Sequence, residues 1–263
     1  MTTKELFPNE ERATAASIQE YQHKTGSVLY LAVITRPDIA FTVSQLCRFN
    51  INLSEEHYEG VNHLLRYLQN TRTLALQLGG TDTFDVYSDA SFADNTINRK
   101  SSQAYVMKLF RGTIRWRANK QDTVTTSTTE AELLALAQAA KESMFISRLI
   151  TELGTIRLIH SDVALLQTKL QHVDIHNHWL HQEALTNRIS VRHTPTTEMI
   201  ADGLTKALPA QQFQKFVMQV GLVDINDKIQ ERRFKELTAE DLSEQRNSLM
   251  EEELNNGSEG WPT

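Results

Sequence analysis

Cysteine is almost absent from the sequence, since Cys47 is the only one among 263 residues. A single cysteine cannot form an internal disulfide framework, and it excludes a zinc site built from cysteines. No apolar run approaches the roughly 20 residues that a membrane-spanning helix needs, and the N-terminal MTTKELFPNEER lacks the apolar core of a signal peptide. We therefore expect an intracellular protein of the cytoplasm or the nucleus that makes no contact with a membrane.

Most of the sequence also lacks an excess of either charge. The net charge of −6 comes entirely from the segment Asp224 to Thr263, where 11 residues are acidic and 5 are basic. This segment is charged and poor in aromatic residues, a composition that predicts a loose helix followed by disorder.

Acidic residues are absent between Asn95 and Gln121, a stretch that carries seven lysines and arginines. Such a local excess of positive charge can attract a phosphate backbone. The alternative is a sheet surface with ordinary solvated side chains, and charge alone does not decide between the two. The residues that we predict to bind nucleic acid are Arg99, Lys100, Arg115, Arg117 and Lys120.

Residues 13–70 show helical patterns. An apolar stretch ends just before Pro37, which suits the first turn of a new helix. Ser54 is a candidate N-cap, followed by Glu55 and Glu56 in the first turn of a further helix. This part of the chain is therefore predicted to be a helical region.

The rest of the chain up to residue 223 alternates between strand and helix patterns. The predicted strands cover residues 74–78, 84–89, 101–110, 113–119, 155–162 and 189–195. The predicted helices cover residues 128–153, 165–185, 196–208 and 211–223. Short turns between neighbouring strands predict an antiparallel meander, and the complete order predicts a mixed α/β sheet with helices on its faces.

Four acidic residues stand where a strand or a helix would hold each of them firmly: Asp89, Glu130, Asp162 and Asp202. Asp89 and Asp162 each end a predicted strand, a position at which mixed sheets hold ligands rigidly. Brought together by the fold, the four carboxylates would bind hard divalent cations, which prefer oxygen ligands and serve phosphate chemistry. Each also has a structural explanation, as a turn aspartate, a capping-box glutamate after Ser127 or a solvated helix residue.

A second candidate for metal binding is the cluster of His172, His176 and His178 with Asp174. The i,i+4 spacing of His172 and His176 on a helix could serve a zinc site. Neither an HExxH pattern nor a nearby cysteine accompanies the cluster. We therefore favour a helix in which these side chains form hydrogen bonds.

Ordered motifs across about residues 15–223 resemble a known family. They are TRPDIAFTVSQLCRF, LLRYLQNT, YSDAS, RKSSQAYV, ANKQDTVTTSTTEAELLALAQAAKE, VDIHNHWL and TPTTEMIADGLTKALP. In these motifs the chain resembles the C-terminal end of a copia-type retrotransposon Pol polyprotein, which comprises the connection after the reverse transcriptase palm and the ribonuclease H domain. The resemblance implies a ribonuclease H-like mixed sheet with flanking helices, preceded by a small helical connection region. We accordingly expect a connection region over residues 1–72, a ribonuclease H-like domain over 73–223 and an acidic, partly disordered tail over 224–263.

By position, the resemblance implies that Asp89, Glu130, Asp162 and Asp202 hold Mg²⁺, or Mn²⁺ in its place, and hydrolyse the RNA strand of an RNA–DNA hybrid. In such two-metal chemistry one ion activates a water and the other stabilises the leaving 3′ oxygen. Hybrid shape and a 2′-hydroxyl contact would select the substrate more than base sequence does. The sequence has no Tyr-x-Asp-Asp palm motif, so this chain alone cannot polymerise DNA. A reverse transcriptase domain as protein partner and a chain that acts alone are both left open.

One departure from the family pattern bears on activity. The segment between Asp162 and His172 is shorter than in the family, as if a helix had been deleted just after the third carboxylate. Asp162 could then belong to the far side of the deletion, and the true third ligand would be lost. The alternative function is therefore a catalytically inactive relic that acts at most as a nucleic-acid-binding or structural module. A DNA-cutting relative of the same fold, such as an integrase, fits the ending Ala-Asp-Gly-Leu-Thr-Lys less well.

Overall fold

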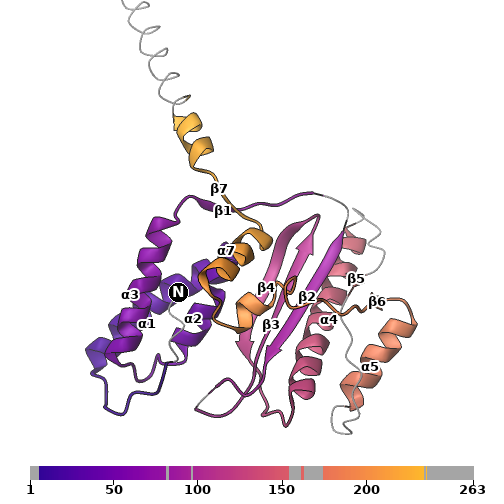
Figure 1. Cartoon of the computed structure of the whole chain (residues 1–263), viewed down its shortest axis with the longest axis horizontal. Helices are drawn as coiled ribbons and strands as arrows, with labels where there is room; N and C mark the ends of the chain where they lie inside the picture. The colour runs from indigo at the N-terminus through magenta and orange to yellow at the C-terminus, as the bar shows by residue number, and fades with distance from the viewer. Residues whose placement is uncertain are drawn as a thin grey trace, which may run out of the picture. The chain divides into compact units, whose positions relative to one another are not determined.

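The computed structural model describes residues 6–80, 83–95, 97–153, 161–162, 174–233 and 235. The chain divides into two compact units, Met1–Val223 and Asp224–Thr263. The first unit has the predicted mixed α/β class, with N-terminal helices followed by a five-stranded sheet and the helices that pack on it (Figure 1). A division of this unit near residue 72 stays a prediction.

The N-terminal region consists of helices α1 (Ala15–Ile34), η1 (Pro37–Ile39), α2 (Ala40–Cys47) and α3 (Glu55–Asn70). Thr14 caps α1, because its hydroxyl oxygen accepts a hydrogen bond from the Ser17 backbone N–H at 3.1 Å. Pro37 occupies the first turn of η1, where its missing N–H leaves no bond unmade. Ser54 is the N-cap of α3, and its backbone N–H donates to Nδ1 of His57 at 2.8 Å. The predicted helical region is therefore confirmed.

A buried ion pair joins these helices at the Thr-Arg-Pro-Asp motif. Arg36 donates from Nε to Asp38 Oδ1 at 2.9 Å and from Nη2 to Asp38 Oδ2 at 2.7 Å. Tyr67 on α3 donates to the same Oδ2 at 2.6 Å, and Arg36 Nη1 donates to the Thr71 carbonyl at 3.1 Å. The two charged side chains are only 7% and 0% exposed, so their hydrogen bonds within the protein replace those to water. The motif thus fastens η1 to the C-terminal end of α3.

The sheet is built on an antiparallel meander of β2 (Phe84–Ser91), β3 (Ser102–Leu109) and β4 (Gly112–Lys120). This arrangement confirms the predicted meander. The turn between β3 and β4 uses Phe110 and Arg111, whose φ values of 51° and 64° are left-handed. Two such residues match the type I′ hairpin turn, whose twist suits the flanking strands.

Two short strands extend the sheet in parallel with β2, namely β5 (Ser161–Asp162) and β6 (Ile189–Ser190). The resulting strand order is β4-β3-β2-β5-β6 (Figure 1). The strand predicted over residues 189–195 is therefore correct in place and too long. The strand predicted over residues 155–162 lies mostly outside the described residues.

The two faces of the sheet are buried against different helices. On the face that we call the α4 face, Val86 and Met107 pack with Leu133 of α4 (Thr128–Glu152). On the opposite face, called the N-terminal-helix face, Trp116 donates from Nε1 to the Ala32 carbonyl of α1 at 2.6 Å. Because side chains alternate along a strand, every residue of β2, β3 and β4 belongs to one face or the other.

The C-terminal part of the first unit contains α5 (Asp174–Leu185), α6 (Asp202–Thr205) and α7 (Ala210–Gln219), and β7 (Leu222–Asp224) begins at its last two residues. The helix predicted over residues 196–208 is wrong in extent, because only α6 is α-helical and the residues before it form turns. Thr196 and Thr197 are poor helix formers, which explains the late start. The helix predicted over 211–223 ends early because Gly221 takes a left-handed φ of 82°.

The residues after Gly221 form a second small sheet with β1 (Leu74–Leu76) instead of continuing the helix. The Gln77 backbone N–H donates to the Gly221 carbonyl at 2.8 Å beside this pairing. The predicted strand over 74–78 therefore exists but lies outside the main sheet. Among the described helices, none has the length and apolar character needed to cross a membrane.

Candidate functional site

Asp89 and Asp202 meet at a single lysine. Asp89 lies in β2, Asp202 is the first residue of α6, and Lys206 directly follows that helix. The Lys206 ammonium lies 3.0 Å from Asp202 Oδ1 and 3.4 Å from Asp89 Oδ2. The Thr205 hydroxyl also donates a hydrogen bond to Asp89 Oδ2. One short helix thus brings a carboxylate, a hydroxyl and an ammonium to Asp89.

These two carboxylates are largely shielded from water, with 14% of the Asp89 side chain and 13% of the Asp202 side chain exposed. Burial raises the pKa of Asp89 to about 6, against the lowering effects of the Thr205 hydroxyl and the Lys206 ammonium, while the charge of Asp202 adds to the rise. Burial also opposes the charged form of Lys206, but the two carboxylates outweigh it and raise the pKa of that ammonium. The site is a pair of shielded carboxylates that share one ammonium.

Glu130 is engaged at the start of α4. Its Oε2 accepts hydrogen bonds from the Thr126 backbone N–H at 2.6 Å and from the Thr126 hydroxyl at 2.9 Å. Its own backbone N–H donates to the Ser127 hydroxyl oxygen at 3.1 Å. The residue is buried, with 7% of its surface exposed. The Ser127 hydroxyl caps the helix, and the Glu130 carboxylate satisfies the backbone of Thr126, the residue before the N-cap. A role of Glu130 as a metal ligand stays a prediction.

Asp162 is described through its backbone alone. In the parallel pairing of β2 and β5 it lies opposite Asp85, four residues before Asp89 on the same strand. At about 3.3 Å per residue, four residues correspond to roughly 13 Å along the strand. A position for its side chain beside Asp89 stays a prediction.

The donors present suit a divalent ion in chemistry, because Asp89 and Asp202 direct carboxylate oxygens at one cation, which here is the Lys206 ammonium. Within the described residues, no group of three or more His, Cys, Asp or Glu side chains is placed to hold a metal ion. Asp89 and Asp202 are thus two of the four carboxylates that the predicted metal site requires. The contribution of Glu130 and Asp162 stays a prediction.

The histidine cluster predicted as a second metal candidate is partly described. His176 and His178 lie on α5, while His172 falls outside the described residues. Burial and the charge of Lys141 both lower the pKa of His176. The nearby positive charge also disfavours a metal cation at His176.

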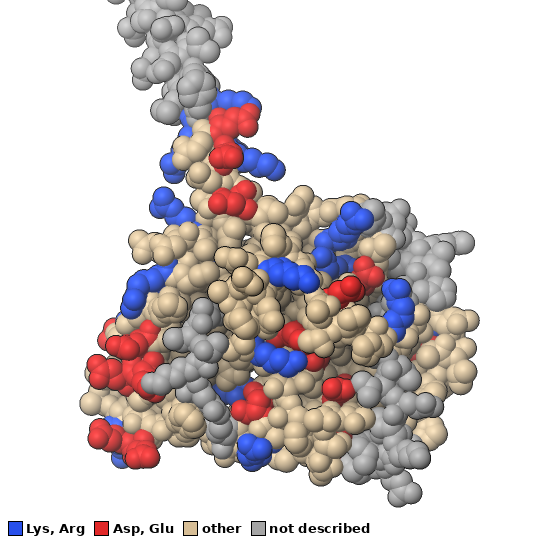
Figure 2. Space-filling view, viewed as in Figure 1, with Lys and Arg blue, Asp and Glu red and all other residues tan. Residues whose placement is uncertain are grey.

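The predicted nucleic-acid-binding residues lie on both faces of the sheet. Arg115 and Arg117 are opposite Met107 and Tyr105 in the β3–β4 pairing, which places them at the α4 face. Arg115 forms an ion pair of 2.9 Å with Glu142 of α4. On the side viewed in Figure 2, positive and negative side chains are interspersed, and acidic ones gather over the N-terminal helices.

Lys120 lies opposite Ser102 and belongs to the N-terminal-helix face, which it shares with Asp89. Burial, together with the charges of Arg48 and Lys100, lowers the pKa of Lys120. Three positive side chains therefore approach one another on this face. Arg99 lies in the loop between β2 and β3, where it is exposed and has a left-handed φ of 54°.

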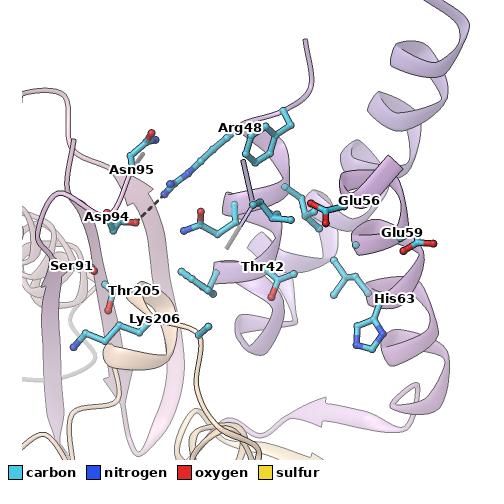
Figure 3. Close-up of a pocket in the computed structure, with 18 of the residues that line it drawn as sticks. Thr42, Arg48, Glu56, Glu59, His63, Ser91, Asp94, Asn95, Thr205 and Lys206 are labelled. Carbon is cyan, nitrogen blue, oxygen red and sulfur yellow. Dashed lines mark ion pairs between the residues drawn. The ribbon is translucent and has the colours of Figure 1, made fainter. Parts of the chain in front are cut away.

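A groove of about 710 Å³ adjoins the Asp89–Asp202 pair through Thr205 and Lys206. Residues of α2 and α3 form one wall, and the end of β2 with the loop after it forms the other (Figure 3). Arg48 reaches across from α2, with its Nη2 3.6 Å from Asp94 Oδ2 and 2.9 Å from the Ser102 hydroxyl. The groove therefore runs from the N-terminal helices to Thr205 and Lys206, which contact the carboxylate pair.

Comparison with known proteins identifies relatives of the chain. It is 33% identical over 235 residues to the Retrovirus-related Pol polyprotein from transposon TNT 1-94 of Nicotiana tabacum, a match of 84% of this chain and 18% of that protein. It is 32% identical over 222 residues to the Pol polyprotein from transposon RE1 of Arabidopsis thaliana, a match of 78% of this chain and 15% of that protein. The chain is a homologue of copia-type retrotransposon Pol polyproteins.

This Pol homologue spans less than a fifth of the length of these two relatives. It is also 38% identical over 129 residues to Secreted RxLR effector protein 161 of Plasmopara viticola, covering 91% of that protein, so the two chains belong to one family. No family model matches the chain.

Sequence reasoning missed several residues that shape the site of this Pol homologue. Thr205 and Lys206 lie in the motif TPTTEMIADGLTKALP, and the i,i+4 spacing of Asp202 and Lys206 is typical of an ion pair. Arg48 and Asp94 come from separate regions of the chain and form their pair only after folding. Nothing local in the sequence signals that contact.

Proposed function

We propose that this Pol homologue is a ribonuclease H-type endonuclease that hydrolyses the RNA strand of an RNA–DNA hybrid. The observation that carries the proposal is the convergence of Asp89 and Asp202, from distant parts of the chain, on one cation. The sheet supports it, because an antiparallel meander continued by parallel strands in the order β4-β3-β2-β5-β6 agrees with the ribonuclease H-like fold that the motifs imply.

In this proposal Asp89 and Asp202 hold the metal, with Glu130 and Asp162 as the further carboxylates. Magnesium, or manganese in its place, would supply the charge that activates the attacking water and stabilises the leaving 3′ oxygen. The Thr205 hydroxyl orients Asp89 through its hydrogen bond to Oδ2. In this proposal a nucleic-acid strand approaches along the groove that Thr205 and Lys206 line, and a reverse transcriptase domain is the proposed protein partner.

The direct test is cleavage of a labelled RNA–DNA hybrid by the full chain with Mg²⁺ or Mn²⁺. We expect cleavage of the RNA strand, no cleavage of a DNA duplex of the same sequence, and loss of activity in Asp89→Asn. The matched control is Asp122→Asn, which changes an exposed aspartate in the turn before α4 and should cleave like the wild type. Equal cleavage by Asp89→Asn and the wild type would reject the assigned site.

A second candidate function is a catalytically inactive module that binds nucleic acid. Two observations favour it: Glu130 is engaged at the helix start, and the backbone of Asp162 pairs opposite Asp85 and not beside Asp89. Hybrid binding without cleavage in either metal would support this candidate over the enzyme.

A further inference from the structure

Lys206 has a fixed backbone and a side chain with room to move. Its backbone N–H donates to the Asp202 carbonyl at 2.9 Å as the C-cap of α6. Its side chain is 43% exposed, three times the exposed fraction of either aspartate, and it lines the groove. Figure 3 shows this side chain extending along the wall that carries Ser91 and Thr205. The ammonium can therefore leave the carboxylates without unfolding α6.

The position of this ammonium is the one that a bound cation would take. Two shielded carboxylates that face each other repel unless a positive charge lies between them. Lys206 provides that charge, with contacts of 3.0 Å and 3.4 Å to the two aspartates. A divalent ion on the same oxygens would repel the ammonium, because like charges at such short range disfavour one another.

We propose that the Lys206 ammonium holds the cation position between Asp89 and Asp202 in the metal-free protein and is displaced into the adjoining groove when a divalent ion binds. The inference rests on the proposed function, since it takes these two aspartates as metal ligands. Two consequences follow. The carboxylates are kept in place before the metal arrives, and the ion binds less tightly than it would to the same carboxylates without the lysine.

The displacement can be measured on the wild-type chain without any activity assay. An amine-selective acetylating reagent, followed by mass spectrometry, reports how accessible each lysine is. We expect Lys206 to be protected in the metal-free protein and to be acetylated severalfold faster with Mg²⁺. Lys215 on α7 is the internal control, because its Nζ donates to the Thr197 carbonyl at 2.6 Å and to neither aspartate. Its rate should stay constant.

The competition can be measured by calorimetric titration of Mg²⁺ into metal-free protein. Lys206→Met keeps the apolar stem and removes the charge, so we expect Mg²⁺ to bind about tenfold more tightly, equivalent to about 1.4 kcal/mol. Lys215→Met removes the same charge elsewhere on the surface, and its affinity should remain that of the wild type. The difference between the two variants isolates the local competition from the change in net charge.

The two measurements distinguish an error in the displacement of Lys206 from an error in the proposed metal site. If Mg²⁺ binds the wild type and Lys206→Met equally and leaves acetylation of Lys206 unchanged, the displacement is wrong and the metal site stands. If Mg²⁺ binds none of the proteins, the metal site itself is wrong and the displacement falls with it. If Lys206→Met does not fold, acetylation of the wild type decides alone.

Discussion

Gly203 lies so close to the ring of Phe216 that a Cβ at position 203 would be 2.5 Å from the ring atoms Cγ and Cδ2. Phe216, on α7, is only 2% exposed, and a ring packed at interior density has little space to move away. The contact sets α6 against α7. It thereby helps to position Asp202 and Lys206, which begin and follow α6.

Gly203→Ala should therefore destabilise the protein, by about 1–3 kcal/mol in the free energy of unfolding, as overpacked cores do. Denaturant titration measures this change. Gly26→Ala is the matched control, because Gly26 is exposed on α1 and its Cβ would meet no atom within 4 Å. That variant should gain about 0.5–1 kcal/mol, since alanine suits a helix better than glycine. Similar effects of the two substitutions would contradict the close contact.

The sequence predicted those parts of the fold whose causes are local. Capping residues such as Ser54 and Ser127 begin α3 and α4 where the pattern placed them. The packing of α6 against α7 could not be read, because the Gly203–Phe216 contact joins two separate segments. Glu130 would use the same carboxylate as a metal ligand or as a hydrogen-bond acceptor at the helix start. The sequence is identical in both cases, so its hydrogen bonds to Thr126 are known only from the folded structure.

The pairing register of parallel strands is equally hidden from the sequence. Asp89 and Asp162 both end predicted strands, and that similarity suggested that they lie side by side. Backbone pairing places Asp162 opposite Asp85, and a position for its side chain beside Asp89 stays a prediction. A strand of two residues has too few side chains to fix its register by an apolar pattern.

Asp89→Asn should stabilise the protein at neutral pH. The pKa of Asp89 is about 6 in the folded protein, above its ordinary value of 3.8, so the folded state binds this proton more tightly than the unfolded state. The protonated carboxyl group contributes fully to the free energy of unfolding below about pH 4. This contribution decreases as the pH rises towards 6 and is absent above that. We expect the unfolding free energy of Asp89→Asn relative to the wild type to increase by about 1–3 kcal/mol from pH 4 to pH 7.

Thermal or denaturant unfolding across this range measures the change. A difference between Asp89→Asn and the wild type that stays constant from pH 4 to pH 7 would show that burial does not perturb this carboxyl group.

Asp38→Asn should destabilise the N-terminal helices strongly. It leaves the Arg36 guanidinium buried without a charged partner and weakens the hydrogen bond from Tyr67. Removing one partner of a buried pair costs about 3–5 kcal/mol, whereas replacing both with apolar residues is often neutral. Arg36→Met combined with Asp38→Leu should therefore recover much of the loss in denaturant titrations. A loss below about 1 kcal/mol for Asp38→Asn would indicate an ordinary surface pair.

Two charge-reversal variants can show which face of the sheet meets the hybrid. Lys120 shares the N-terminal-helix face with Asp89 and lies near Lys100, whereas Arg115 and Arg117 lie at the α4 face. Since the proposed site is on the first of these faces, Lys100→Glu with Lys120→Glu should weaken hybrid binding more than Arg115→Glu with Arg117→Glu.

Fluorescence anisotropy over a range of salt concentrations measures the effect. Each lost phosphate contact should reduce the slope of log affinity against log salt by about 0.7–0.9. The two double variants change the net charge equally, so any difference between them comes from position. A larger loss in the arginine variant would place the hybrid at the α4 face. Unchanged slopes in both variants would mean that these side chains do not contact the phosphate backbone.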